Sequence, residues 1–264
     1  MIYNNISFDG YHCREHMGLI YVPDKPEQLI APQTIYSYSI SGSPGTTAYG
    51  DQHIIREYNL SGTFYPARDI DDEAEARRLW RGIAQWLGVG RRKLVMDSEP
   101  DKYIIAEVQS MDNDEYGWID GGLHVTWLCQ PYHWVLHPDE LSLIVTGSAS
   151  SDWCVETSLP APVDVSIVNS GTVAVTSATV FVDSKCVVFE GLELLPDERL
   201  DITMMTPIGA VITSEDGEKI SAMPMMKTFD QLLASGKVNI SCALNFAASG
   251  GSAILQLKAH GCWR

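Results

Sequence analysis

The chain has 264 residues, with 18 lysine and arginine residues against 34 aspartate and glutamate residues, a net charge of −16 at neutral pH. This length is sufficient for two domains that each bury a hydrophobic core. A chain this acidic repels phosphate backbones, and no stretch reaches the ~18 apolar residues of a membrane-spanning helix. We therefore expect neither nucleic-acid recognition nor membrane insertion.

The amino-terminal residues and the cysteines indicate the compartment. The opening stretch MIYNNISFDG has neither the basic region nor the apolar run of a signal peptide. The six cysteines form no C-x-x-C pair, so we expect reduced, mostly buried thiols in a protein made in a cytoplasm. These cysteines are Cys13, Cys129, Cys154, Cys186, Cys242 and Cys262.

Residues 17–50 predict short strands and one long loop. MGLIYV (17–22) has the composition of a strand, and in the stretch that follows only TIYSYSI (34–40) is expected to be extended. The segment Ser41–Gly50 (SGSPGTTAYG) predicts an exposed loop. Its glycines have neither the G-x-G-x-x-G nor the G-x-x-x-x-G-K spacing of a phosphate-binding loop.

Residues 52–96 predict a strand, a helix and a second strand. From Tyr58 to Phe64 every second residue is apolar or small, which is the period of a half-buried strand. The apolar residues then recur every three or four positions, after an acidic start and before two glycines, which predicts a helix over 71–87. We expect its tryptophans to pack against a sheet.

A basic cluster lies on this helix and on the strand that follows it. It contains six of the eighteen basic residues of the chain. One interpretation is a solvated face of the helix and turn, and the other is a contact for an acidic neighbour. The cluster consists of Arg77, Arg78, Arg81, Arg91, Arg92 and Lys93.

The remaining chain predicts mainly strands. KYIIAEVQSM (102–111) and GGLHVTWLC (121–129) have the pattern of an antiparallel meander. Beyond His137, short β-rich runs separated by turns predict an all-β sandwich, and TFDQLLASG (228–236) is the one expected helical turn. We therefore place an N-terminal domain at 1–137 and a C-terminal domain at 138–264.

The residues with catalytic potential give weak patterns. HCREH (12–16) has the H-x-x-E-H order of a class of zinc peptidases, but it lies between Gly10 and Gly18, which leaves about two helical turns at most and no evident third ligand. A glycosidase needs only two carboxylates, such as Glu190 with Glu193, but any acidic chain offers many such pairs. We expect no enzyme activity, no bound metal and no cofactor.

Exposed tryptophans would offer a different function. Trp153 and Trp263 are candidates for stacking on a saccharide, although packing in a core or an interface is the competing interpretation. The alternative function of the chain is thus a carbohydrate-binding module, in which the C-terminal sandwich recognises a host-surface glycan.

Several short motifs follow one another over residues 1–135. ISFDGYHCREHMGLIYV (6–22) opens with a phenylalanine, a glycine, a short turn and a Gly-Leu strand. REYNLSGTFYP (56–66) and EARRLWRGIAQWLG (75–88) follow, and VTWLCQPYHW (125–134) ends a strand on a Cys-x-Pro-aromatic element. In this order the motifs resemble the distal tail proteins of long-tailed bacteriophages, which form the hub of the baseplate.

The resemblance implies a mainly β fold. It implies an N-terminal β-sandwich-like domain with one α-helix and a hairpin, followed by a galectin-like β-sandwich, which PVDVSIVNSGTVAVTSATVFV (162–182) and ILQLKAHGCWR (254–264) resemble more loosely. It also places HCREH in a turn and not on a helix. The family supplies no catalytic residue.

The resemblance also implies a place in the virion. Six first domains would form a ring at the tail tip, joining the major tail tube protein to the tail-tip or tail-associated protein, with a receptor-binding protein or host glycan as a further partner. We expect the basic cluster and the loop Ser41–Gly50 to contribute to contacts in the ring or with these neighbours. Assembly would take place in the cytoplasm of the bacterial host.

Overall fold

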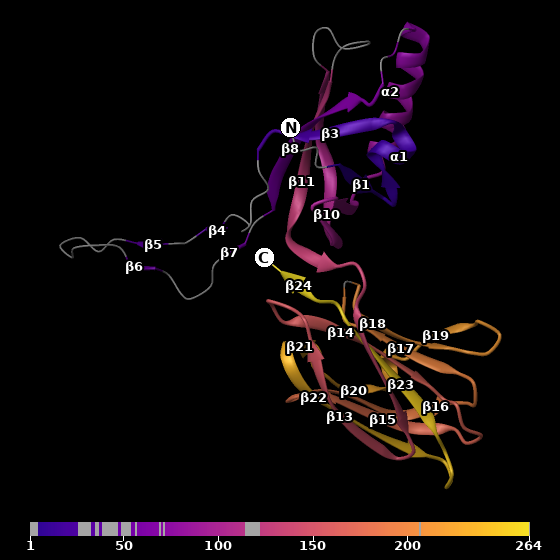
Figure 1. Ribbon diagram of the computed structural model, residues 1–264. Coiled ribbons are helices and arrows are strands. Elements are labelled where there is room, and N and C mark those ends of the chain that lie inside the picture. The colour runs from indigo at the N-terminus through magenta and orange to yellow at the C-terminus, as the bar shows by residue number, and fades with distance from the viewer. Residues whose placement is uncertain are drawn as a thin grey trace. The chain divides into compact units, whose positions relative to one another are not determined.

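The structure is a computed structural model that describes residues 5–25, 33–34, 37–38, 47–48, 54–55, 57–68, 70, 72–113, 122–205 and 207–263. The chain divides into two compact units, Met1–Leu136 with Arg264 and His137–Trp263. Both are built mainly from antiparallel strands, which confirms the predicted mainly β fold (Figure 1). None of the described helices is both long and apolar enough to span a membrane.

In its described residues the first unit contains one large sheet, the short helix α1 and the longer helix α2. The strands of this sheet follow the order β2-β1-β9-β10-β11-β8-β3, and β4 pairs with β7 and β5 with β6 in two small ribbons. The elements are β1 (Ile6–Phe8), β2 (Tyr11–His12), α1 (Cys13–Met17), β3 (Leu19–Pro23), β4 (Gln33–Thr34), β5 (Ser37–Tyr38), β6 (Thr47–Ala48), β7 (Ile54–Ile55), β8 (Tyr58–Pro66), α2 (Glu73–Leu87), β9 (Arg92–Met96), β10 (Glu99–Asn113) and β11 (Leu123–Val135).

The core of the first unit lies between α2 and the large sheet. The helix buries one face, and the ring of Trp86 lies 5.9 Å from that of Phe64 on β8, centre to centre. The ring of Phe8 on β1 lies 4.8 Å from the ring of Trp127 on β11, centre to centre. These aromatic side chains come from strands far apart in the sequence, so burying them fixes both the sheet order and the position of the helix.

The predicted helix over 71–87 is confirmed as α2. It begins at Glu73 because the Asp72 side chain accepts a hydrogen bond from the N–H of Ala74 and caps the first turn. Asp71 lies outside the described residues. The strand predicted to follow the helix is β9, and the predicted meander is formed by β10 and β11.

The second unit is a sandwich of a seven-stranded and a five-stranded sheet. Their strand orders are β12-β23-β14-β17-β18-β19, with β21 beside β14, and β13-β22-β15-β16-β20. The elements are β12 (Asp139–Val145), β13 (Ser148–Val155), β14 (Ala161–Val168), β15 (Val175–Val182), β16 (Lys185–Leu194), β17 (Arg199–Thr203), β18 (Gly209–Thr213), β19 (Lys219–Ser221), η1 (Met223–Met225), β20 (Met226–Phe229), β21 (Leu233–Ala234), β22 (Gly236–Phe246), β23 (Ala253–Ala259) and β24 (Cys262–Trp263).

Alternation along the strands places the core of this sandwich. On β14, Val163, Val165 and Ile167 are buried while Asp164 and Ser166 on the opposite face are half-buried. The buried side chains of both sheets form one apolar cluster. Each long strand therefore contributes every second residue to the core, as the β-rich runs of the sequence predict.

Two sequence predictions are wrong at the level of elements. TFDQLLASG forms the end of β20, a loop and β21, because Val187 of β16 pairs with Phe229, and Ala161 of β14 pairs with Ala234. Strand pairing with β16 and β14 prevails over the local helix propensity of the leucines and alanine. The HCREH segment was expected in a turn, and that expectation is wrong because Cys13–Met17 forms the five-residue helix α1.

Candidate functional site

The exposed face of α2 carries half of the predicted basic cluster. Arg77 pairs with Glu73 one turn earlier at 2.5 Å, and the Arg78 Nε donates to the Ala74 carbonyl oxygen at 3.2 Å. Arg81 is exposed, and we find no ion pair for it within the described parts of the chain. The spacing of three and four residues places these arginines together on the side opposite the core.

The other half of the cluster is held by partners within the first unit. Arg91 bridges Glu57 at 2.9 Å and Glu107 at 3.1 Å, and these hydrogen bonds and charges raise its pKa. Arg92 lies 3.4 Å from Asp9, and the Lys93 ammonium lies 4.2 Å from the centre of the Tyr103 ring.

These contacts divide the basic cluster in two. Arg91, Arg92 and Lys93 fasten the start of β9 to its neighbours, so their charges are largely committed. Arg77 pairs with Glu73, so Arg78 and Arg81 are the exposed arginines of α2 that another molecule can contact. Sequence spacing placed the helical arginines on one face of α2, but it gave no indication of the acidic and aromatic partners of Arg91, Arg92 and Lys93, which the pairing of the strands brings close.

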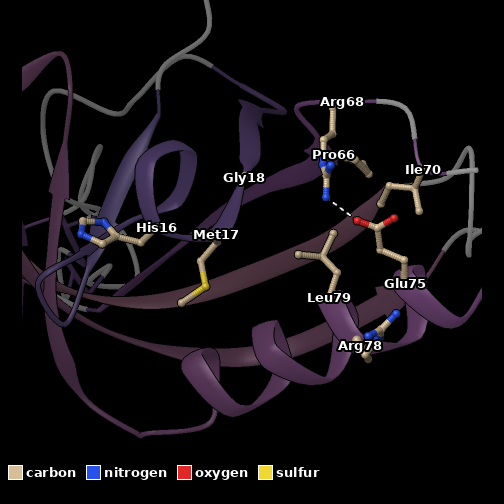
Figure 2. Close-up of a pocket in the computed structure, with 9 residues that line it drawn as sticks. All are labelled: His16, Met17, Gly18, Pro66, Arg68, Ile70, Glu75, Arg78 and Leu79. Atoms are coloured by element: carbon tan, nitrogen blue, oxygen red, sulfur yellow. Dashed lines mark hydrogen bonds and ion pairs between the residues drawn. The ribbon is translucent and has the colours of Figure 1, made fainter. Parts of the chain in front are cut away.

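A cavity of about 480 Å³ lies beside Arg78 on α2 (Figure 2). Met17 and Leu79 are half-buried against the core and supply apolar lining. Arg78 also lines the cavity, and Arg68 and Glu75 form an ion pair across it (Figure 2). The remaining lining residues are His16, Gly18, Pro66 and Ile70.

The HCREH motif forms a capped helix end. His12 Nδ1 accepts a hydrogen bond from the N–H of Glu15 at 3.2 Å, and His12 Nε2 lies 3.2 Å from the Asp97 carboxylate. His16 Nδ1 accepts from the N–H of His12 at 3.0 Å, and Gly18 ends the helix with φ of 64°. Both ring nitrogens of His12 and the Nδ1 of His16 are thus engaged in hydrogen bonds within the first unit.

The remaining candidates from the sequence are metal ligands, two tryptophans and the loop Ser41–Gly50. Throughout the residues that the structure describes, no group of three His, Cys, Asp or Glu side chains is arranged to hold a metal ion. Trp153 is 8% exposed and lies in the core of the second unit, so its indole offers no face to a sugar, which corrects that stacking assignment. Trp263 on β24 is half-buried. Of the loop Ser41–Gly50, only Thr47–Ala48 lies within the described residues.

Comparison with known proteins gives one consistent result. No protein-family model and no curated protein sequence matches the chain. The Dit protein of phage SPP1, whose structure is described as a paradigm of the hub adsorption apparatus in phages that infect Gram-positive bacteria, superimposes with a TM-score of 0.72. The match covers 100% of both chains at 13% identity.

The chain has the fold of a phage Dit protein. Chains from two structures of the phage P2 baseplate in its activated conformation, one with Ca and one with Sr, also superimpose on this chain. Their TM-scores are 0.59 and 0.60, with 9% and 12% identity over 99% of this chain and 98% of theirs. The fold expected from the order of the short motifs is therefore confirmed over the whole chain.

Proposed function

We propose that the protein is a structural hub of a phage tail, located at the tail tip of the virion and assembled in the cytoplasm of the bacterial host. The observation that carries this proposal is the likeness to SPP1 Dit over 100% of both chains. A hub acts by holding other proteins in register, which requires surfaces on its folded units and no reactive group.

In this proposal six copies of the first unit close into a ring. A ring needs a heterologous interface, in which two different patches of each copy meet head to tail. The ring joins the major tail tube protein on one side to the tail-tip or tail-associated protein on the other. A receptor-binding protein is a further partner.

The exposed arginines of α2 supply one patch of the interface. Arg78 and Arg81 project from the helix, and Arg78 lines the cavity beside Met17 and Leu79. The chain has 34 acidic residues, so a neighbouring copy has abundant carboxylates to place against them. The loop Ser41–Gly50 contributes to the same contacts or to those with a neighbouring tail protein.

The test is the mass of the purified full-length protein over a concentration series, by light scattering, followed by negative-stain images of the largest species. A hexamer, or two stacked hexamers, with a central hole supports the proposal. A monomer at every concentration, both alone and mixed with the major tail tube protein of the same phage, contradicts the proposal.

A pair of charge reversals tests the interface. We expect Arg78→Glu with Arg81→Glu to shift assembly to at least tenfold higher concentration, because acidic neighbours then face like charge. The matched control is Lys185→Glu with Lys219→Glu, two exposed lysines of the second unit that give the same change in net charge. Unchanged assembly in the arginine variant would remove α2 from the interface.

A further inference from the structure

The strand β12 forms one edge of the seven-stranded sheet of the second unit. It pairs with β23 on one side, and among the described residues no strand pairs with its other side. Seven residues, Asp139–Val145, run along this edge. Because the backbone groups on the outer side of an edge strand have no partner strand, an open edge of this length is a template for a further strand.

The alternation of hydrogen bonds shows which residues of β12 direct their backbone groups to the open side. The N–H of His260 donates to the Pro162 carbonyl oxygen at 2.9 Å, so the even-numbered residues of β23 direct their backbone groups to β14. The odd-numbered residues of β23 direct theirs to β12, where they meet its odd-numbered residues. The N–H and C=O groups of the even-numbered residues of β12 therefore point to the open side. These residues are Glu140, Ser142 and Ile144.

The outer face of the sheet has an apolar row that ends at this edge. Ile144 on β12 lies opposite Ile254 on β23, and Ile254 lies opposite Val168 on β14. Directly opposed residues of antiparallel strands point to the same face, with their Cβ atoms about 5 Å apart. Ile254 and Val168 are half-buried, whereas Ile144 is 74% exposed, more than any other large apolar side chain of the described residues. A strand added to β12 would place its next apolar side chain against Ile144.

The pairing with β23 shows which side chains suit the residues of β12 on this face. An isoleucine lies opposite Ile144, and Gln256 lies opposite Ser142. Lys258 lies opposite Glu140, with its ammonium 2.8 Å from the carboxylate, and the Glu140 side chain is still 62% exposed. An apolar, a polar and a basic residue thus occupy every second position of β23. A strand on the open side meets the same three residues of β12, so the same pattern of side chains complements them.

The same residues disfavour a second copy of β12 as the added strand. Two β12 strands paired antiparallel about Ser142 would place Glu140 of each copy opposite Ile144 of the other. Each carboxylate would then lie beside an apolar side chain, where it gains no cation and loses water. A register centred on Ile144 would pair the two isoleucines, but β12 ends at Val145, so almost none of the open edge would be used.

We propose that the open edge of β12 binds an extended segment of another protein, which adds a strand to the seven-stranded sheet. At every second position the segment carries an apolar side chain opposite Ile144, a polar one opposite Ser142 and a basic one opposite Glu140. Its backbone pairs with the outward N–H and C=O groups of β12 and supplies affinity, and its side chains supply specificity. This surface lies within the second unit and does not depend on ring formation by the first unit.

The experiment titrates a fluorescently labelled peptide with the full-length protein and follows the fluorescence anisotropy. The peptide has the sequence of β23, AILQLKA, with an added lysine at each end for solubility. A control peptide has aspartate at the positions that correspond to Ile254 and Lys258. We expect saturable binding of the first peptide and at least tenfold weaker binding of the control, because aspartate would then lie opposite Ile144 and Glu140.

A proline on the edge tests the backbone pairing. Ser142→Pro removes an outward N–H that takes no part in the ladder with β23, and proline is tolerated at such edge positions. We expect this variant to melt close to the wild-type temperature and to bind the peptide at least tenfold more weakly. Ile144→Asp, at an exposed side chain, should weaken binding similarly through the lost apolar contact.

The matched control is Ser150→Pro on β13, the edge strand of the five-stranded sheet. The N–H of Leu244 donates to the Gly147 carbonyl oxygen at 2.7 Å, and the register from there places the N–H of Ser150 on the open side of β13. This variant therefore makes the same replacement at an equivalent position of the other sheet, and it should leave binding of the peptide unchanged.

Hydrogen exchange locates the bound peptide. The amides of Ser142 and Ile144 should exchange at least tenfold more slowly in the complex, and that of Ser150 at an unchanged rate. The proposal is overturned by absence of binding up to about 1 mM protein, by equal weakening in Ser150→Pro, or by protection at another edge strand. A lower particle mass of Ile144→Asp would mean that the edge joins copies of this chain, which also overturns it. Ring formation by the wild-type protein tests the hub proposal separately.

Discussion

The indole N–H of Trp86 donates a hydrogen bond of 2.9 Å to the carbonyl oxygen of Phe8, 78 residues earlier in the chain. The rings of the same two residues meet edge to face at 6.3 Å. This pair joins α2 to β1, which is the strand beside β9 in the large sheet. The helix that carries the exposed arginines is therefore fixed to the sheet by a directional contact as well as by apolar packing.

Replacing Trp86 with phenylalanine should lower the free energy of unfolding by about 1–3 kcal/mol more than the same replacement at Trp80. Trp86→Phe leaves the buried Phe8 carbonyl without its donor, whereas the Trp80 Nε1 is buried and has no hydrogen-bond partner in the described structure. Both variants lose similar apolar volume from the same helix face. Urea denaturation of both gives the difference, and equal losses would show that the Trp86 hydrogen bond contributes nothing.

The elements that sequence alone predicted are those with a clear period and their own boundaries. α2 has an apolar face, an acidic start and the Asp72 cap, all within one segment. β13 was missed because residues 148–152 are serine, alanine and aspartate, and the strand exists through pairing with β22. α1 was missed because the side chain of His12 caps a helix of only five residues.

The candidate sites were less predictable than the fold. Sequence spacing brought Arg77, Arg78 and Arg81 to one helix face, but the contacts of Arg91 and Lys93 depend on residues in other strands. The apolar row of the second unit depends on the register of three strands, and register is set by long-range pairing that no local pattern encodes. No local pattern shows which side of β12 stays unpaired.

A methyl group at Gly62 should destabilise the first unit. A Cβ at this position of β8 would lie 2.5 Å from the hydroxyl oxygen of Tyr21 and 2.7 Å from the carbonyl oxygen of Val22. Tyr21 is 1% exposed and cannot easily move away, so Gly62→Ala should cost about 1–3 kcal/mol.

The matched control for this substitution is Gly82→Ala on the exposed side of α2. No atom lies within 4 Å of a Cβ there, and alanine favours the helix by about 0.5–1 kcal/mol over glycine. Thermal unfolding of both variants should therefore give shifts of opposite sign. If Gly62→Ala does not change the unfolding temperature, Tyr21 and β3 can move away from the added methyl group at little cost.

The stability of the second unit should depend on pH through Asp164. Burial by itself raises the pKa of this carboxyl group, but hydrogen bonds from His260 and the N–H of Met204 outweigh burial and lower the pKa below its usual value. A carboxyl group with a lowered pKa in the folded state stabilises the fold above its unfolded pKa of about 3.9. That contribution disappears as the pH falls through the lower, folded value.

We therefore expect Asp164→Asn to be less stable than wild type at about pH 5.5, by about 1–3 kcal/mol, with the difference narrowing at about pH 3. Urea unfolding at the two pH values measures this change. Asp216→Asn, in the exposed turn between β18 and β19, gives the same change in charge and serves as control. If the difference in free energy of unfolding between Asp164→Asn and wild type is the same at both pH values, Asp164 does not contribute to the pH dependence.

The cysteines of the second unit should differ sharply in reactivity. Cys242 on β22 is 2% exposed, and burial raises its pKa to about 12, so almost none of it is thiolate near neutral pH. Cys154 on β13 is exposed. Because the thiolate is the nucleophile, iodoacetamide should modify Cys154 in the native protein and reach Cys242 only after unfolding.

Peptide mass mapping of timed samples, with a urea-unfolded sample as the fully labelled reference, follows the labelling of both cysteines. A Cys154→Ser variant should lose this labelling without exposing Cys242, whereas native labelling of Cys242 at the rate of Cys154 would mean that the two sheets of the sandwich open readily in solution.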